Sequence, residues 1–212
     1  MTQRADAMQT QRTEMVQLAA SLFQRGYATG AAGNLSLRLA DGSLLATPTG
    51  ASLGRLSPPR LSHLSADGVW RGGDQPTKEL PFHLALYQNS PRCQAVVHLH
   101  SPWCTALSCL EGLDPRSAIR PMTPYLVMRV GDVPVVPYHR PGDARLADAL
   151  AALAPNHRAF LLANHGVVTY GDSLQEAVNN AEELEATARL VFILARHPVR
   201  YLSAEHIAQL RS

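Results

Sequence analysis

Two histidines stand one residue apart near the end of an apolar segment, in the stretch QAVVHLHSPWCTALS that runs from Gln94 to Ser108. Side chains at positions i and i+2 of a strand point to the same face, so His98 and His100 are expected to project into one space. Neutral imidazoles that converge with a further nitrogen or oxygen ligand are what Zn²⁺ or a similar divalent ion requires. The alternative is a pair of core histidines satisfied by backbone hydrogen bonds, and the pair alone does not separate the two.

A third histidine and a carboxylate extend this pattern. His165 closes another apolar segment and is followed by Gly166, which would allow a close backbone approach or a positive φ. Three imidazoles leave one coordination position for a substrate in a tetrahedral catalytic site. Glu79, in PTKEL, begins an expected helix and could move protons there, or it could be an ordinary first-turn glutamate favoured by the helix dipole. His83, one turn further on, is expected to pack beside the sheet.

Three short segments have the composition of anion-binding turns. TGAAGN (29–34) and TPTG (47–50) are small-residue turns whose backbone N–H groups could converge on an oxyanion. PTK (76–78) stands at a helix start, where unpaired N–H groups, a hydroxyl and a cation could meet a phosphate. Neither turn is a P-loop or a GxGxxG element, so nucleotide binding has no support.

The helices and strands that must position these residues are predicted from the spacing of apolar residues and from the turn residues between segments. Strands and helices alternate irregularly along the chain, without a steady βαβ repeat, which favours an α/β fold with a mixed or antiparallel sheet covered by helices. Ser173 is the expected N-cap of the last helix. The expected helices span residues 10–25, 77–90, 101–110, 143–153 and 173–195, and the expected strands lie at 35–40, 41–50 (a hairpin with the first), 61–70 (a second hairpin), 95–100, 133–139, 158–166 and 167–171.

Composition limits the class of protein. A chain of 212 residues can form one well-buried domain, here taken as residues 1–212. The net charge of +2 gives no broad electrostatic case for nucleic acid or an anionic membrane, and no apolar run approaches the roughly 20 residues that span a bilayer. The three cysteines form no CxxC pair, and the first residues lack the apolar core of a signal peptide. We therefore expect a cytoplasmic protein with reduced thiols.

Five segments in this order carry a resemblance to a known family. AAGNLSLR, LLATPTG, TKELPFHLALY, AVVHLHSPWCTALS and LLANHGVV resemble the class II aldolase/adducin family across nearly the whole chain. FQRGYATGAAGNLSLRL, PRCQAVVHLHSPW and RPGDARLADAL resemble the 3-oxo-tetronate 4-phosphate decarboxylases within it. The resemblance implies a single-domain α/β/α sandwich with a mostly antiparallel central sheet, assembled as a homotetramer with active sites at subunit interfaces.

The same resemblance implies roles for individual residues. Glu79 would bind the metal in the resting state and serve as acid/base, and Tyr125 would reach the site of a neighbouring subunit. The aldolases carry two serines before this glutamate, whereas Thr77 and Lys78 stand here, and the added cation suits a substrate with an extra carboxylate. By matched position, the metal ligands would be His98, His100 and His165 with Glu79, and the phosphate-binding residues would be Gly33, Asn34, Thr49, Gly50, Thr77 and Lys78.

The activity that follows is a zinc-dependent carboxy-lyase reaction in sugar-acid catabolism. A metal that polarises the C3 carbonyl of a 3-oxo-tetronate 4-phosphate would stabilise the enediolate left when CO₂ departs, and protonation at C2 by Glu79, by Tyr125 or by a water that they hold would give dihydroxyacetone phosphate. The alternative is a class II sugar-phosphate aldolase, epimerase or dehydratase that uses the same metal site. A non-catalytic, adducin-like scaffold would instead have lost the histidines and the glutamate.

Overall fold

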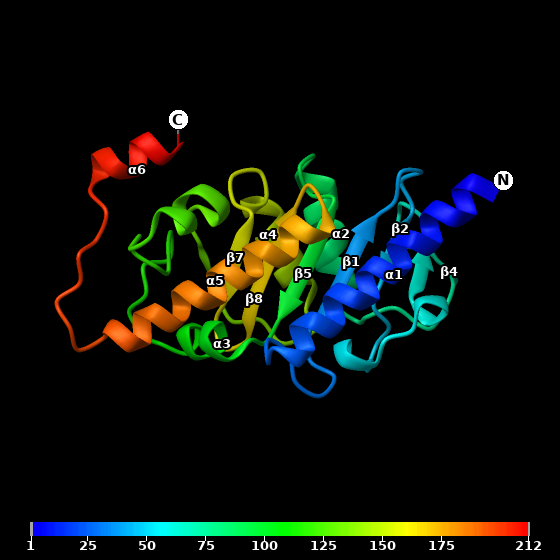
Figure 1. Cartoon of the computed structure of the whole chain (residues 1–212), viewed down its shortest axis with the longest axis horizontal. Helices are drawn as coiled ribbons and strands as arrows, with labels where there is room; N and C mark the ends of the chain where they lie inside the picture. Colours follow the sequence, from blue (N-terminus) through cyan, green and yellow to red (C-terminus); the bar gives the residue numbers. More distant parts are fainter. Residues whose placement is uncertain (1, 212) are drawn as a thin grey trace.

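An eight-stranded mixed sheet runs through the middle of the computed structural model, which describes residues 2–211 (Figure 1). The strand order is β4-β3-β2-β1-β5-β8-β7-β6. Neighbouring strands are antiparallel except β6 and β7, which form the parallel pair among the described residues. The strands are β1 (Asn34–Arg38), β2 (Leu44–Ala46), β3 (Ser62–Leu64), β4 (Trp70–Gly72), β5 (Ala95–Leu99), β6 (Val135–Val136), β7 (Ala159–Leu162) and β8 (Gly166–Gly171).

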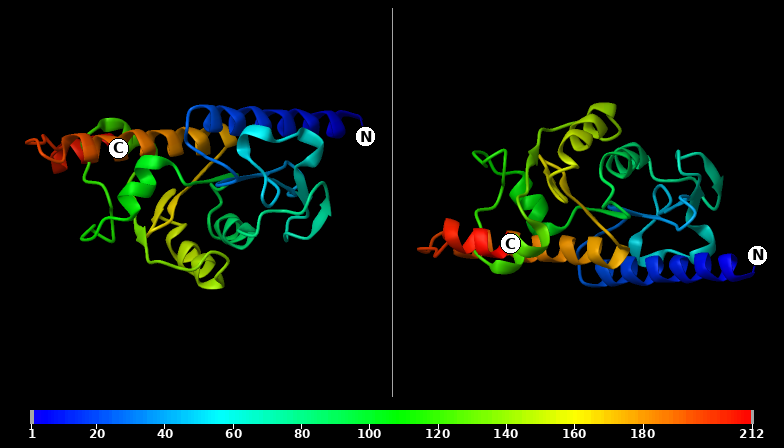
Figure 2. Two further views of the ribbon diagram at one scale, coloured as in Figure 1. Left: turned by 90° about the horizontal axis from the view of Figure 1, so that it is seen from below. Right: turned by 90° about the horizontal axis from the view of Figure 1, so that it is seen from above.

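Helices cover both faces of this sheet. α1 (Thr2–Gln24) and α5 (Leu174–Leu194) lie end to end along one face, and α2 (Leu80–Asn89) and α4 (Ala144–Leu153) lie on the other (Figure 2). Each face has its own hydrophobic core, the first built around α1 and α5 and the second around α2 and α4. The expected α/β/α sandwich with a mostly antiparallel sheet is therefore confirmed.

The alternation of side chains across β5 decides where its histidine points. Val97 and Leu99 enter the core under α1 and α5, whereas Val96 enters the core under α2 and α4. His98 shares the face of Val96 because side chains alternate along a strand. The ring of Phe82, on α2, meets the His98 ring edge-on with centroids 5.6 Å apart. The face that carries the histidines is therefore the one covered by α2 and α4.

Several elements differ from expectation for identifiable reasons. α1 begins at Thr2, eight residues before the expected start, because its first turns are polar helix formers that carry no apolar period. The strand expected at 133–139 shrinks to Val135–Val136, since Pro134 and Pro137 flank it and lack the N–H that a ladder needs. Two helices were not expected from the sequence, a π-helical turn at Leu126–Val130 and α6 (Ala204–Arg211). The N-cap at Ser173 is confirmed, because the Glu176 N–H donates to its hydroxyl at 3.1 Å.

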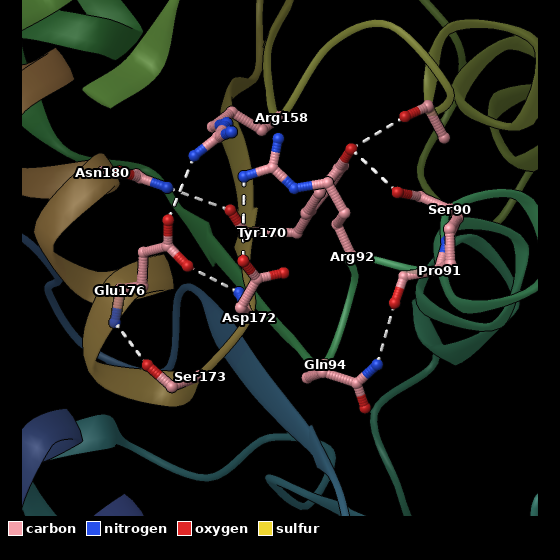
Figure 3. A network of polar contacts seen from close by, with 11 residues as sticks. Ser90, Pro91, Arg92, Gln94, Arg158, Tyr170, Asp172, Ser173, Glu176 and Asn180 are labelled. Carbon is pink, nitrogen blue, oxygen red and sulfur yellow. Dashed lines mark hydrogen bonds and ion pairs between the residues drawn. The ribbon is translucent and has the colours of Figure 1, made fainter. Parts of the chain in front are cut away.

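The end of β8 remote from the histidines is held by Tyr170 (Figure 3). The Tyr170 hydroxyl donates to the carbonyl of Ala154 at 2.8 Å and accepts from the Ser90 hydroxyl at 3.0 Å. The Asn180 side chain donates to the Tyr170 carbonyl at 3.0 Å. These bonds tie β8 to the ends of α2 and α4 and to α5, and so fix the strand whose other end follows His165. Within residues 2–211, none of the helices combines the length and the apolar character needed to cross a membrane.

Candidate active site

The three strand-end histidines meet in one cluster. His98 and His100 lie at the end of β5, and His165 directly precedes β8, the antiparallel neighbour of β5. The ring centroids are 4.9 Å apart for His98 and His100, 4.8 Å for His98 and His165, and 4.7 Å for His100 and His165. One nitrogen from each ring lies within 4.8 Å of the others. The fold therefore brings together the three histidines that the sequence pattern singled out.

The protonation of this cluster suits a metal ligand set. His98 Nδ1 lies 2.9 Å from the Val167 carbonyl, so this nitrogen carries the hydrogen and Nε2 presents a lone pair to the cluster. His98 Nε2 lies 3.0 Å from His100 Nε2. Burial, reinforced by the neighbouring imidazoles, lowers the pKa of His98, and burial likewise lowers the pKa of His100 and of His165. Neutral imidazoles with converging lone pairs are the donor set that a divalent transition metal takes.

Glu79 adds a carboxylate to the same space. It stands directly before α2, with Oε2 3.4 Å from His98 Nε2 and Oε1 3.6 Å from His165 Nε2. The Asn34 side chain donates to Oε2 at 2.7 Å, and the Glu79 N–H donates to the Thr77 hydroxyl at 3.2 Å. The three imidazoles thus form a group that could hold a divalent ion, and the Glu79 carboxylate lies beside two of them.

Two glycines let neighbouring backbone pack against the histidine segment. A Cβ at Gly166 would lie 2.4 Å from the Leu99 carbonyl oxygen, and one at Gly33 would lie 2.9 Å from the His98 carbonyl oxygen. Gly33 also has a φ of +82°, which other residues rarely adopt. The expectation that Gly166 permits a close backbone approach is confirmed. A side chain at either position would displace the strand end that carries the cluster.

Behind the cluster, Glu185 of α5 fixes the chain directly after His100. Its carboxylate is 5% exposed and accepts hydrogen bonds from the Ser101 hydroxyl at 2.6 Å, from the Trp103 N–H at 2.8 Å and from the Cys104 N–H at 2.8 Å. The bonds to Trp103 and Cys104 satisfy donors in the first turn of α3 (Pro102–Ser108), which has no side-chain cap of its own. Glu185 was not predicted from the sequence, since its partners lie more than 80 residues away.

A pocket of about 310 Å³ opens above the cluster. Glu79, His100 and His165 line it, whereas His98 is fully buried beneath. Pro141 and Gly142, from the loop before α4, also line it and were missed by the sequence analysis. All of the residues expected at the phosphate, Gly33, Asn34, Thr49, Gly50, Thr77 and Lys78, lie on its wall.

Backbone hydrogen bonds hold two of these wall segments side by side. The Thr49 N–H donates to the Gln75 carbonyl at 2.9 Å, and the Thr77 N–H donates to the Thr47 carbonyl at 3.2 Å. Because these two amides are used, an anion in the pocket would be met by side chains such as the exposed Lys78 rather than by those N–H groups.

Tyr125 stands apart from this pocket within its own chain. It precedes the π-helical turn, its side chain is 55% exposed, and the Arg129 guanidinium lies 5.6 Å from its ring centroid. The described residues that line the pocket do not include Tyr125. Its expected place in a neighbouring subunit's site stays a prediction.

Residues 13–192 match the family described as the class II aldolase and adducin N-terminal domain. The chain belongs to this family. The resemblance read from its motifs is confirmed. The fold also agrees with a solved structure: the crystal structure of YgbL from Escherichia coli superposes with a TM-score of 0.96 at 65% identity, over 97% of this chain and 99% of that one.

Relatives of this chain include proteins named as decarboxylases and proteins named as aldolases. The protein named 3-oxo-tetronate 4-phosphate decarboxylase in Escherichia coli K12 is 65% identical over 98% of each chain. The protein named L-fuculose phosphate aldolase in the same organism is 33% identical, over 92% of this chain and 89% of the aldolase. Identity to the decarboxylase is about twice that to the aldolase, in agreement with the prediction from the motifs.

Proposed function

We propose that the chain is a metal-dependent decarboxylase that converts a 3-oxo-tetronate 4-phosphate to dihydroxyacetone phosphate and CO₂. The observation that carries the proposal is the pocket, which has a histidine and carboxylate cluster at its floor and Thr49, Thr77 and Lys78 on its wall. Such a pocket suits a small substrate with a reacting centre over the cluster and an anionic group beside the cation. The names of the relatives most similar to this chain support the same reaction.

The metal would be held by His98, His100 and His165 with Glu79. Zinc is the ion that we favour, because three imidazoles and an exchangeable fourth position are typical of its catalytic sites. When bound, it would polarise the substrate carbonyl and stabilise negative charge on that oxygen.

The residues of the chain supply orientation and a proton. Lys78 and the threonine hydroxyls would hold the phosphate, so that the bond between C1 and C2 stands over the cluster. That bond breaks with departure of CO₂, its electron pair stays with C2, and a proton must reach C2 from the protein. Glu79 lies at the pocket wall and is the residue that we assign to this proton transfer.

The remaining parts of the proposal concern the oligomeric state of the protein and its cellular compartment. We propose a cytoplasmic homotetramer in which Tyr125 of one subunit reaches the pocket of the next. The exposure of Tyr125 and of Met128 beside it, at 55% and 57%, supports a contact between subunits on this face. Light scattering of the purified protein, together with the activity of Tyr125→Phe, tests it: a monomer or a variant with unchanged kcat would refute this part.

The experiment that tests the function is a product assay on matched substrates. The purified, zinc-loaded protein is given the 3-oxo-4-phosphates of both C2 configurations and, separately, L-fuculose 1-phosphate. Release of CO₂ with an equal amount of dihydroxyacetone phosphate supports the proposal. Aldehyde from the second substrate with no CO₂ from the first would refute it and favour the aldolase, and an inverted stereocentre without bond cleavage would indicate an epimerase.

A further inference from the structure

A buried chain of hydrogen bonds leads away from the carboxylate of Glu79. Asn34 Nδ2 lies 2.7 Å from Glu79 Oε2, and Asn34 Oδ1 lies 2.6 Å from His83 Nε2. His83 Nδ1 lies 2.7 Å from the Ser36 hydroxyl, which in turn lies 2.7 Å from the Tyr87 hydroxyl. The four residues behind Glu79 are at most 6% exposed. His83 and Ser36 are fully buried, so solvent cannot substitute for a partner that either of them loses.

Chemistry fixes the direction of the first bond. An ionised carboxylate only accepts hydrogen bonds, so the Asn34 group that faces Glu79 is the NH₂ end of its amide. The oxygen end then faces His83 and can only accept, so His83 Nε2 must carry a hydrogen. The alternative orientation of the amide would place its oxygen 2.7 Å from a carboxylate oxygen, with no hydrogen between them.

The rest of the chain follows from the charge state of His83. Burial, together with the neighbouring His98, lowers the pKa of His83 to about 3, so the ring is neutral at physiological pH. With its hydrogen on Nε2, Nδ1 accepts from the Ser36 hydroxyl, and Ser36 accepts from Tyr87. Each hydrogen in the chain therefore points toward Glu79.

We propose that His83 is a positioning residue, which holds the Asn34 amide with its N–H toward Glu79 and thereby fixes the carboxylate over the cluster. The inference rests on the proposed role of Glu79 in proton transfer. An asparagine amide is nearly symmetric in shape, so packing alone cannot select one orientation, whereas an imidazole N–H that faces the oxygen end can. With Oε2 held by Asn34, Oε1 is the carboxylate oxygen without this bond.

A matched set of variants separates this role from a packing role. His83→Phe keeps a ring of similar size but removes both nitrogens, and His83→Gln replaces the ring with an amide whose NH₂ can stand near the place of Nε2. Tyr87→Phe removes only the far end of the chain. We expect kcat to fall about 10- to 100-fold in His83→Phe, to stay within about threefold in His83→Gln, and to change less than about twofold in Tyr87→Phe. KM and zinc content should stay near wild type in all three.

A double-mutant cycle tests whether His83 acts through Asn34. In an Asn34→Ala background, His83→Phe should cause little further loss of kcat, because the group that it orients is gone. If the fold losses of kcat from the two single variants multiply in the double variant, the two residues act independently and the proposal is overturned. Wild-type kcat in His83→Phe, or a His83→Gln variant as impaired as His83→Phe, would overturn it as well.

Crystal structures of the metal-free variants give a readout that does not depend on turnover. The Glu79 carboxylate should keep its contact with Asn34 in the wild type, in His83→Gln and in Tyr87→Phe, and should leave it in His83→Phe. An unmoved carboxylate in His83→Phe contradicts the positioning role. If the wild type releases no CO₂, the proposed function fails, while these structures still decide whether His83 positions Glu79.

Discussion

The replacement Glu185→Gln should destabilise the fold strongly, because this buried carboxylate alone satisfies three donors around the start of α3. Its two oxygens are not equivalent: Oε2 accepts from the Ser101 hydroxyl and the Cys104 N–H, and Oε1 accepts from the Trp103 N–H. A glutamine amide can keep its oxygen on only one side. The favourable choice places that oxygen toward the two donors and leaves the NH₂ group facing the Trp103 N–H.

The magnitude follows from what is lost. A buried donor without a partner costs about 1–3 kcal/mol, and bonds to a charged acceptor contribute about 0.5–1.5 kcal/mol more than bonds to a neutral one. Some relaxation of the first turn of α3 offsets part of the sum. We therefore expect Glu185→Gln to lower the free energy of unfolding by about 2–4 kcal/mol, and to weaken zinc binding because α3 starts two residues after His100.

Urea unfolding measures this change, with a chelator present so that bound metal does not add its own stabilisation. Glu182→Gln is the matched control on the same helix, since Glu182 pairs with Arg25 at the surface and should contribute less than about 1 kcal/mol. A Glu185→Gln variant within about 0.5 kcal/mol of wild type would refute the reasoning, as would a control that loses as much.

The other predictions concern the histidine cluster, the pocket and His83 in the buried hydrogen-bond chain. His98→Ala should lose most bound metal and activity, and wild-type metal content by elemental analysis would exclude His98 as a ligand. Glu79→Gln should keep the fold and much of the metal but lose most of kcat, since Gln has no useful pKa; an unchanged kcat would leave Glu79 as an ordinary helix-start residue. Lys78→Met should lower kcat/KM about 10- to 100-fold with unchanged metal content, and wild-type kinetics would refute its contact with the substrate. Because the pKa of His83 is about 3 in the fold and near 6.5 when unfolded, the unfolded chain binds the extra proton between these values. Stability should therefore fall as pH drops below 6.5, by up to about 1.4 kcal/mol per pH unit from this residue, and the slope should flatten in His83→Gln; equal slopes in urea titrations from pH 4 to 7 would contradict it.

The cluster was predictable because its residues are close to simple sequence signals. The i and i+2 spacing of His98 and His100 puts them on one face of a strand, and His165 directly precedes β8, the strand that pairs with theirs. The small-residue turns and Lys78 were found by composition, and the structure brings them to one pocket. The layers of the fold followed from the family motifs, whereas element boundaries next to proline, as at Pro134 and Pro137, did not follow from periodicity.

The hydrogen-bond chain behind Glu79 and the contacts of Glu185 with the start of α3 were not predictable from this one sequence. His83 meets Ser36 across 47 residues and Asn34 across 49, and Glu185 meets Ser101 across 84. No local pattern distinguishes these side chains from other polar residues on amphipathic helices, because their partners are set by the packing of α2 and α5 on the sheet. Such contacts are visible only once the tertiary arrangement is known.

The central claim is that this pocket removes C1 from its substrate as CO₂ and delivers a proton to C2 under the control of the protein. The direct test is turnover of 3-oxo-tetronate 4-phosphate, labelled with ¹³C at C1, in D₂O. We predict that all of the label appears as CO₂ and that the dihydroxyacetone phosphate carries one deuterium on its hydroxymethyl carbon, in a single stereochemical configuration. Label retained in the phosphorylated product, or deuterium spread equally over both configurations at the earliest times, would contradict the account.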